Sequence, residues 1–373
     1  MNYPPAHTGD DVVEVGEHKV ADPYRWLEDV DAPDTQAWVL GQQQLTAAAL
    51  EPAAQVREQI RARLTELWDF PSWSAPAQHQ KRWFQWRNSG LQNQPVLHIL
   101  SSPTDEGRVL LDPNALSATG IVSVPVASPT KDGALLAYAT SEGGADWMTW
   151  RIRDVETGED LPDVVEWSKI TGGAWRADGS GFYYSSYPRP TGNELVAKTG
   201  VLRVQFHRLG TDAADDPIVF ERPDLPLAMP LASVTDDGRF LVVTLVNSGA
   251  TAAATYVQDL TANEPEWEHL AGDLTTFSMV VGSEGEDFLL LTDVGAPRRR
   301  VVRARRGEAP DAWREVVPEG EHMLTQVRHL GGHLVCLYLR HAAAELTVVN
   351  GAGELRHRVN LPKCCTVAQL TGA

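Results

Sequence analysis

Serine chemistry is the first possibility to examine, because a serine hydroxyl becomes a nucleophile only in particular local sequences. Hydrolases with an α/β fold place this serine on a strained strand-to-helix turn written G-x-S-x-G. No such pentad occurs in the 373 residues. The segment Gly179-Ser180-Gly181 follows Asp178 and precedes aromatic residues, which is typical of a β-hairpin turn. We therefore predict no catalytic residue from local motifs, and a serine, histidine and aspartate brought together from distant positions remain an open alternative.

Metal and cofactor motifs are equally sparse. His329 and His333 are four residues apart, but two glycines between them predict a turn, and the glutamate of H-E-x-x-H is missing. The acidic residues within 29–34 hint at a calcium loop, yet Pro33 interrupts them and no glycine or closing glutamate follows at the right offset. We interpret them as polar capping residues ahead of a helix. Because dinucleotide and phosphate-binding glycine patterns are also missing, we predict neither a metal nor a cofactor.

Composition limits the possible partners and the compartment. The net charge of −18 repels phosphate backbones and anionic membranes, so we predict no nucleic acid partner and no membrane association. No basic and apolar leader is seen at the start and no run approaches about 20 apolar residues, so a cytoplasmic location is expected. The three cysteines lack the spacing of a disulfide framework or a zinc site.

One basic cluster interrupts this acidic chain, with six arginines within residues 298–306. Alternation across residues 299–305 is typical of the solvated face of a β-strand, which is our interpretation. A patch that binds anions is the alternative.

The elements that must position any site change in type after Phe70. Residues 1–70 are predicted to be helical, since Pro33 and Pro52 each lie where a helix can begin. An apolar stripe at residues 56, 60, 64 and 67 indicates an amphipathic helix, and two antiparallel helices are the simplest arrangement.

Residues 71–373 are predicted to consist of short strands that recur as a unit. Strong strands recur at steps of about 50 residues, at 82–87, 134–140, 181–186, 239–246, 287–292 and 333–339. Each has a weaker strand before it and a partner strand after it, and four antiparallel strands per repeat are typical of a β-propeller blade. We count six blades, and residues 366–371 have the character of the opening strand of a seventh. The predicted fold is mainly β, a propeller of the seven-bladed type whose seventh blade is only begun, after a short helical segment.

Several segments resemble, in order, the N-terminal half of the prolyl oligopeptidase family of serine peptidases. They are residues 22–29 (DPYRWLED), 90–94 (GLQNQ), 111–114 (LDPN), 143–147 (GGADW), 178–184 (DGSGFYY) and 207–211 (HRLGT). The resemblance covers essentially the whole chain. It implies a seven-bladed propeller that acts as a lid on an α/β-hydrolase domain and restricts the enzyme to short peptides, cleaved after proline. It also implies that the Ser, Asp and His triad lies downstream of the propeller.

The same resemblance suggests which residues of this chain take part in function. Met229 and Ile170 match propeller positions that face the substrate cavity, with structural core as the competing interpretation of both. In the family the N-terminal segment packs on the hydrolase domain. Trp26, Leu27 and Trp38 are therefore candidates for the domain interface, and without that domain they should form an exposed apolar patch.

Three hypotheses of function follow. The first is a truncated peptidase, inactive alone because its triad is missing and dependent on a hydrolase domain to cleave short proline-containing peptides. The second is a non-catalytic propeller that binds peptides or proteins. The third is a split peptidase, in which a separate C-terminal hydrolase chain associates with this one.

Overall fold

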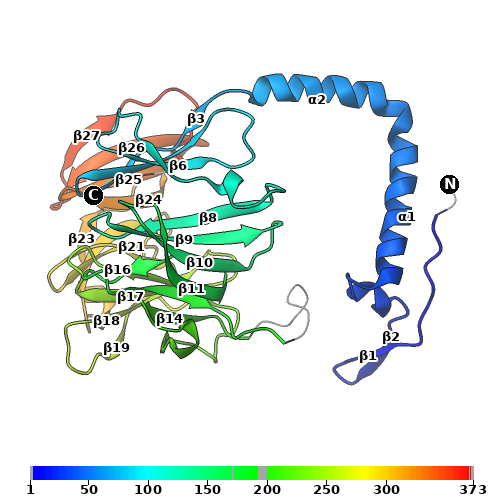
Figure 1. Ribbon diagram of the computed structural model, residues 1–373. Helices are drawn as coiled ribbons and strands as arrows, with labels where there is room; N and C mark the ends of the chain where they lie inside the picture. The colour runs from blue at the N-terminus through cyan, green and yellow to red at the C-terminus, as the bar shows by residue number, and fades with distance from the viewer. Residues whose placement is uncertain (1–2, 170–171, 192–199, 369, 371–373) are drawn as a thin grey trace. The chain divides into compact units, whose positions relative to one another are not determined.

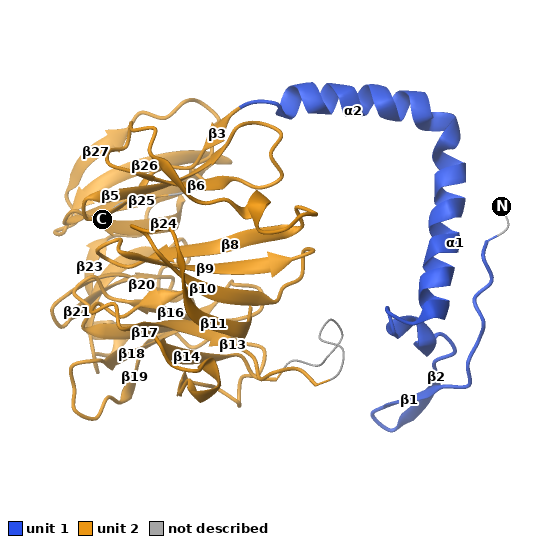
Figure 2. Cartoon of the chain, in the orientation of Figure 1, with its two compact units in different colours: residues 1–70, 193–196 blue, residues 71–192, 197–373 orange. Residues whose placement is uncertain are grey.

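The computed structural model describes residues 3–169, 172–191, 200–368 and 370. The chain divides at Phe70 into two compact units, and the second begins at Pro71 (Figure 2). Each unit is described by itself below. Ile170, one of the two candidates for the substrate cavity, lies outside the described residues.

The N-terminal unit combines a hairpin with two helices. Its elements are β1 (Val12–Val15), β2 (His18–Ala21), η1 (Arg25–Glu28), α1 (Pro33–Leu50), η2 (Glu51–Ala53) and α2 (Ala54–Trp68). Helix α1 begins at a proline, as predicted, and its N-cap Ala32 is extended with no side-chain cap hydrogen bond. The prediction that all of this segment is helical is wrong for residues 12–21, which form the antiparallel pair β1–β2.

The two helices do not pack against each other as an antiparallel pair. Helix α1 runs into η2 and then into α2 around a corner, as Figure 1 shows. Pro52 lies in η2, where it lacks the N–H that would continue a regular helical ladder. No described residue of α2 is buried, so the helix gains little from packing within its own unit.

The second unit consists of antiparallel sheets that form six consecutive blades (Figure 1). The first three blades are made of β3 (Ser72–Trp73), β4 (Ala77–His79), β5 (Arg82–Asn88), β6 (Val96–Leu100) and β7 (Arg108–Leu111); of β8 (Val122–Pro129), β9 (Leu135–Glu142), β10 (Met148–Asp154) and β11 (Asp160–Ser168); and of β12 (Ala174–Trp175), β13 (Gly181–Ser186), β14 (Arg203–Arg208) and β15 (Ile218–Phe220). Strands β3 and β4 both pair with β5, so they act as one interrupted inner strand. Short helical turns η3 (Pro113–Ala115) and η4 (Ala213–Asp215) lie between strands.

The last three blades are regular four-stranded sheets. They are made of β16 (Met229–Val234), β17 (Phe240–Val246), β18 (Ala253–Asp259) and β19 (Trp267–Ala271); of β20 (Ser278–Glu284), β21 (Asp287–Thr292), β22 (Arg300–Arg305) and β23 (Arg314–Val317); and of β24 (Met323–Leu330), β25 (His333–Arg340), β26 (Ala343–Asn350) and β27 (Leu355–Val359). The turn η5 (Pro310–Ala312) precedes β23. All six predicted strong strands are confirmed as the second strands of these blades. Residues 366–368 and 370 are in no strand, so the start of a seventh blade is not seen among the described residues.

A repeated turn joins the first two strands of blades 2, 3 and 4. In blade 2 the Asp132 carboxylate accepts hydrogen bonds from the Thr130 hydroxyl at 2.6 Å and from the Ala134 amide at 3.0 Å. The Asp237 carboxylate does the same in blade 4, where it accepts from Thr235. The following glycine has a positive φ, 69° at Gly133, which costs a residue without a Cβ little. These Asp-Gly pairs are therefore turns, as the sequence predicted.

Buried apolar clusters lie between consecutive blades. Phe84 of blade 1 packs with Tyr138 of blade 2, and the same pattern continues through Trp150 with Phe182 and through Phe240 with Phe288. A further cluster joins blades 4, 5 and 6. No hydrogen bond or ion pair between described residues joins blade 6 to blade 1. Stability is therefore propagated from each blade to the next along the chain.

Candidate functional site

The three predicted interface residues lie together in the N-terminal unit. The Trp26 ring stacks on His7 with ring centroids 4.1 Å apart, and it meets Trp38 edge to face at 6.5 Å. The Trp26 carbonyl accepts a hydrogen bond from the buried Thr35 hydroxyl at 3.0 Å. These contacts leave Trp26, Leu27 and Trp38 half-buried rather than fully exposed. The expected exposed patch is instead formed by neighbouring residues.

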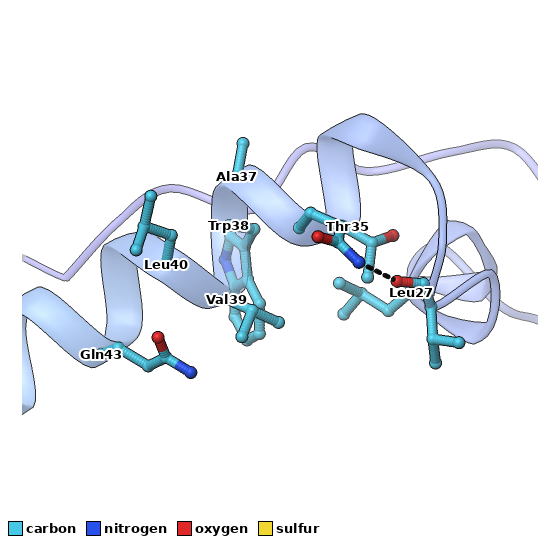
Figure 3. Close-up of a pocket in the computed structure, with 9 residues that line it drawn as sticks. Leu27, Thr35, Ala37, Trp38, Val39, Leu40 and Gln43 are labelled. Atoms are coloured by element: carbon cyan, nitrogen blue, oxygen red, sulfur yellow. Dashed lines mark hydrogen bonds between the residues drawn. The ribbon is translucent and has the colours of Figure 1, made fainter. Parts of the chain in front are cut away.

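Leu27 and Trp38 line a cavity of about 630 Å³ in this unit (Figure 3). Most of its lining is apolar, and the remaining wall comes from Val30, Thr35, Gln36, Ala37, Val39, Leu40 and Gln43. The Gln36 amide donates to the Val30 carbonyl at 3.0 Å across one end. Val39 and Leu40 are exposed by 40% and 54%, so the rim of the cavity is apolar as well. A concave apolar surface of this kind suits a protein partner better than a polar small molecule.

Helix α2 extends this apolar character. The predicted stripe Val56, Ile60, Leu64 and Leu67 is exposed by 49–56%, and Trp68 at its end by 68%. Its apolar spacing is that of a helix face meant for burial, yet this face is open in the described structure. We call these residues, with Val39 and Leu40, the N-terminal apolar surface.

Met229 begins the inner strand of blade 4 and lies in a row that crosses to blade 5. It pairs with Val246, Val246 pairs with Ala253, and Ala253 forms a bridge with Phe277. Met229 is partly buried and packs on the cluster that contains the other three residues. The structure therefore supports a core role for part of this side chain, and its predicted role in the substrate cavity remains a proposal.

An aromatic group on blades 2 and 3 was not predicted as a site. Trp147 meets Trp167 edge to face at 5.6 Å and Tyr187 at 6.1 Å. The Lys169 ammonium lies 4.1 Å from the Trp147 ring centroid. The sequence signal was GGADW at residues 143–147, but Trp167 lies in β11 and Tyr187 directly follows β13, so only the fold brings them near it.

The basic cluster is mostly paired with acidic side chains on the strands around it. Arg303 binds Glu284 at 2.6 Å, Arg306 binds Glu268 at 2.8 Å, and Arg305 binds Asp287. Strand β22 begins at Arg300, so the strand predicted over 299–305 is confirmed except at Arg299, whose backbone is left-handed with a φ of +64°.

A buried histidine with two carboxylates is the nearest approach to a catalytic arrangement in the described residues. His207 Nδ1 lies 3.0 Å from Asp216 and its Nε2 lies 3.1 Å from Asp163, and all three side chains are at most 3% exposed. Burial lowers the pKa of His207, but hydrogen bonds to Asp216 and Asp163 outweigh this effect and raise it overall. Substrate has no access to this imidazole, so the arrangement is structural.

Neither a serine–histidine pair nor a metal site is seen in the part of the chain that the structure describes. Each described hydrogen bond of a histidine ring goes to a backbone carbonyl or a carboxylate. No group of three or more histidine, cysteine or acidic side chains is placed to hold a metal within the described ranges. Among the described helices, none is both long and apolar enough to cross a membrane.

Comparison with known proteins decides the family. Residues 4–373 match the family model described as the N-terminal β-propeller domain of prolyl oligopeptidase. The chain belongs to the prolyl oligopeptidase family. This match covers both the apolar N-terminal unit and the propeller, so the two parts are features of one family architecture.

Prolyl oligopeptidase relatives match the chain over nearly its whole length. A prolyl endopeptidase of Elizabethkingia miricola is 33% identical over 359 residues, which cover 95% of this chain and 50% of the relative. Prolyl oligopeptidase A of Amanita bisporigera is 27% identical over 371 residues, which cover 91% of this chain and 48% of the relative. The chain therefore spans about half the length of the curated relatives it matches.

Solved structures agree on the fold. One, from a study of two prolyl endopeptidases, is 32% identical and superposes with a TM-score of 0.85 over 97% of this chain and 53% of its own. A second structure is prolyl oligopeptidase B of Galerina marginata, bound to a 25-residue macrocyclization substrate. It is 24% identical and superposes with a TM-score of 0.81 over 96% of this chain and 54% of its own. At that identity the second similarity supports the fold alone.

Proposed function

We propose that this chain supplies the N-terminal segment, residues 1–70, and the propeller, residues 71–373, of a serine endopeptidase that cleaves short peptides after proline. The propeller acts as the lid that restricts access, and an α/β-hydrolase domain supplies the catalytic serine, histidine and aspartate. The observation that supports this division of labour is the N-terminal apolar surface, where an amphipathic helix leaves its whole apolar stripe open.

The proposed interface includes Leu27 and Trp38, which line the cavity, and Trp26, which packs beside Trp38. Met229 and Ile170 remain proposed residues of the substrate cavity. A stand-alone binding propeller has no use for an open apolar helix, so this surface favours the peptidase over that alternative. A hydrolase domain on a separate chain would use the same surface. We also propose a cytoplasmic location, supported by three cysteines that are all free.

Association with a hydrolase domain tests the interface. The full chain is titrated with the separately produced C-terminal half of a prolyl endopeptidase relative, and the affinity is measured by calorimetry. The double variant Ile60→Lys with Leu64→Lys should bind about 100-fold more weakly, because each apolar side chain contributes roughly 1.5–3 kcal/mol when buried. The matched control, Gln55→Lys with Ala62→Lys, adds the same charge to the opposite face of α2 and should bind like the unmodified chain. The interface would be contradicted if both double variants lost affinity for the hydrolase half equally, or if neither lost affinity.

A further inference from the structure

Arg299 differs from every other arginine of the basic cluster. Arg298 donates to the Gly320 carbonyl at 3.1 Å, and Arg300 donates to Glu315 at 3.3 Å. Arg303, Arg305 and Arg306 each bind an acidic side chain. The side chain of Arg299 makes neither a hydrogen bond nor an ion pair to any described residue. The Nε atoms of Arg299 and Arg300 are both buried without a partner, but the other two guanidinium nitrogens of Arg300 donate to Glu315 and to the Val294 carbonyl. The alternative that this cluster binds anions is therefore supported at Arg299.

Arg299 is nevertheless held in place. Its guanidinium carbon lies 3.8 Å from the centroid of the Phe277 ring, a cation–π contact that holds the guanidinium against the ring. Its backbone has a φ of +64°, the left-handed region that a residue with a long side chain adopts only when its surroundings require it. Burial lowers the pKa of Arg299, opposed by the nearby charge of Asp293. The Asp293 carboxylate itself accepts a hydrogen bond from the Phe277 amide at 2.7 Å.

The position of Phe277 connects Arg299 to the proposed substrate cavity. Phe277 ends the row that begins at Met229 and passes through Val246 and Ala253, and all four residues pack in one cluster. Arg299 lies in the loop between β21 and β22. This loop leaves β21 beside the start of β20, where Thr292 pairs with Ser278 and the Asp293 amide donates to the Phe277 carbonyl at 3.0 Å. A guanidinium with unused donors thus lies on Phe277, which packs in the same cluster as Met229.

We propose that Arg299 binds a carboxylate group of the peptide that enters this cavity. A guanidinium presents paired N–H donors that match the two oxygens of a carboxylate. A guanidinium that is already held in place loses less conformational entropy when it binds. The inference rests on the proposed function, because it assigns the peptide as the ligand. It predicts that a peptide with an acidic side chain or a free C-terminus binds better than its neutral counterpart, although the chain as a whole is acidic.

Matched peptides test this assignment. The probes are octapeptides with a central proline, each with one glutamate at a different position, and twins with glutamine; a second pair has a free or an amidated C-terminus. Binding to the full chain is measured by NMR titration, and KM and kcat are measured after addition of a hydrolase domain. On the unmodified chain, at least one acidic peptide should bind about tenfold more tightly than its neutral twin and show a lower KM at similar kcat.

Three variants identify the responsible residue. Arg299→Met should abolish the preference, Arg299→Lys should retain part of it, and Arg298→Met should keep it, with thermal unfolding used to confirm that each variant is folded. Equal binding of acidic and neutral twins at all positions, or a preference that survives Arg299→Met, would overturn the proposal. The proposal would also be overturned if Arg299→Met lost affinity for the hydrolase domain but not for peptides. In that case the carboxylate that Arg299 binds would belong to the hydrolase domain. If the mixture did not cleave after proline, the proposed function would be contradicted. The NMR titration with acidic and neutral peptides would still decide whether Arg299 binds a carboxylate.

Discussion

The buried imidazole of His207 shows how single residues stabilise a blade of this propeller. It bridges Asp163 at the edge of blade 2 and Asp216 in blade 3, and the Tyr184 hydroxyl donates to Asp216 at 2.9 Å. Burial lowers the pKa of His207, but its hydrogen bonds to the two carboxylates outweigh this effect and favour the protonated imidazole. Removing it would leave both carboxylates without a positive partner, which is costly in a site that water does not reach.

We predict that His207→Gln lowers the free energy of unfolding by about 3–5 kcal/mol. Because the folded pKa of His207 is raised above its ordinary value of 6.5, its contribution is complete below pH 6.5 and is lost as the pH rises through the folded value. Urea unfolding across this range should show a decline in stability for the unmodified chain that is weaker in the variant. His357→Gln, at an exposed position of β27, serves as control and should change stability by no more than about 0.5 kcal/mol. Parallel pH profiles for the chain with and without His207 would contradict this account.

Little of this residue-level detail could be predicted from the sequence. The partners of His207 are 44 and 9 residues away, and no spacing rule links them before the strands are paired. Arg299 is adjacent to two other arginines of the same chemistry, and only the fold shows which of the three lacks a partner. Met229 was singled out by resemblance, and the structure adds its row of neighbours.

At the scale of elements, tight turns determine how one blade meets the next. Gly353, in the turn between β26 and β27, has a φ of +83°, and a Cβ at this position would overlap the Val316 carbonyl of blade 5. Gly285, in the turn between β20 and β21, has a similar φ of +61° but no atom within 4 Å of an added Cβ. Alanine at Gly285 would therefore add only backbone strain, whereas alanine at Gly353 would add the same strain and a steric clash with blade 5.

We predict that Gly285→Ala costs about 1 kcal/mol, because only the left-handed backbone is penalised. Gly353→Ala should cost about 1–3 kcal/mol more, because overpacking adds to the same penalty. Thermal and urea unfolding of both variants measure the difference. If both variants lost the same free energy of unfolding, a Cβ at Gly353 would not clash with blade 5, which would contradict this account.

Strands were predicted better than helices for a physical reason. A blade strand such as β17 is signalled by local β-branched and aromatic residues, and the Asp-Gly turn before it by two adjacent residues. The hairpin β1–β2 did carry such signals, since β1 is rich in valine and Gly16 opens its two-residue turn, but the prediction of a helical N-terminal segment overlooked them. The predicted antiparallel helix pair assumed that the stripe on α2 would pack against α1, whereas η2 turns the chain instead. An amphipathic pattern predicts a buried face but does not identify the partner that buries it.

At the scale of the whole molecule, two features require explanation together. The propeller is well packed between consecutive blades, whereas the N-terminal unit exposes the apolar face of α2 and an apolar cavity. Exposed apolar area of this extent marks an interaction site in a folded protein. Membership of the prolyl oligopeptidase family agrees with the hydrolase domain that we propose as the partner of this surface.

Hydrolysis of a chromogenic peptide with proline before the reporter group tests this account most directly. The full chain is assayed alone and after addition of a hydrolase domain from a prolyl endopeptidase relative, with that domain alone as the control. We predict no turnover by the chain alone, since no serine is bonded to a histidine among its described residues, and turnover well above the control when the two are mixed. Turnover by the chain alone, or a mixture no more active than the hydrolase domain by itself, would contradict it.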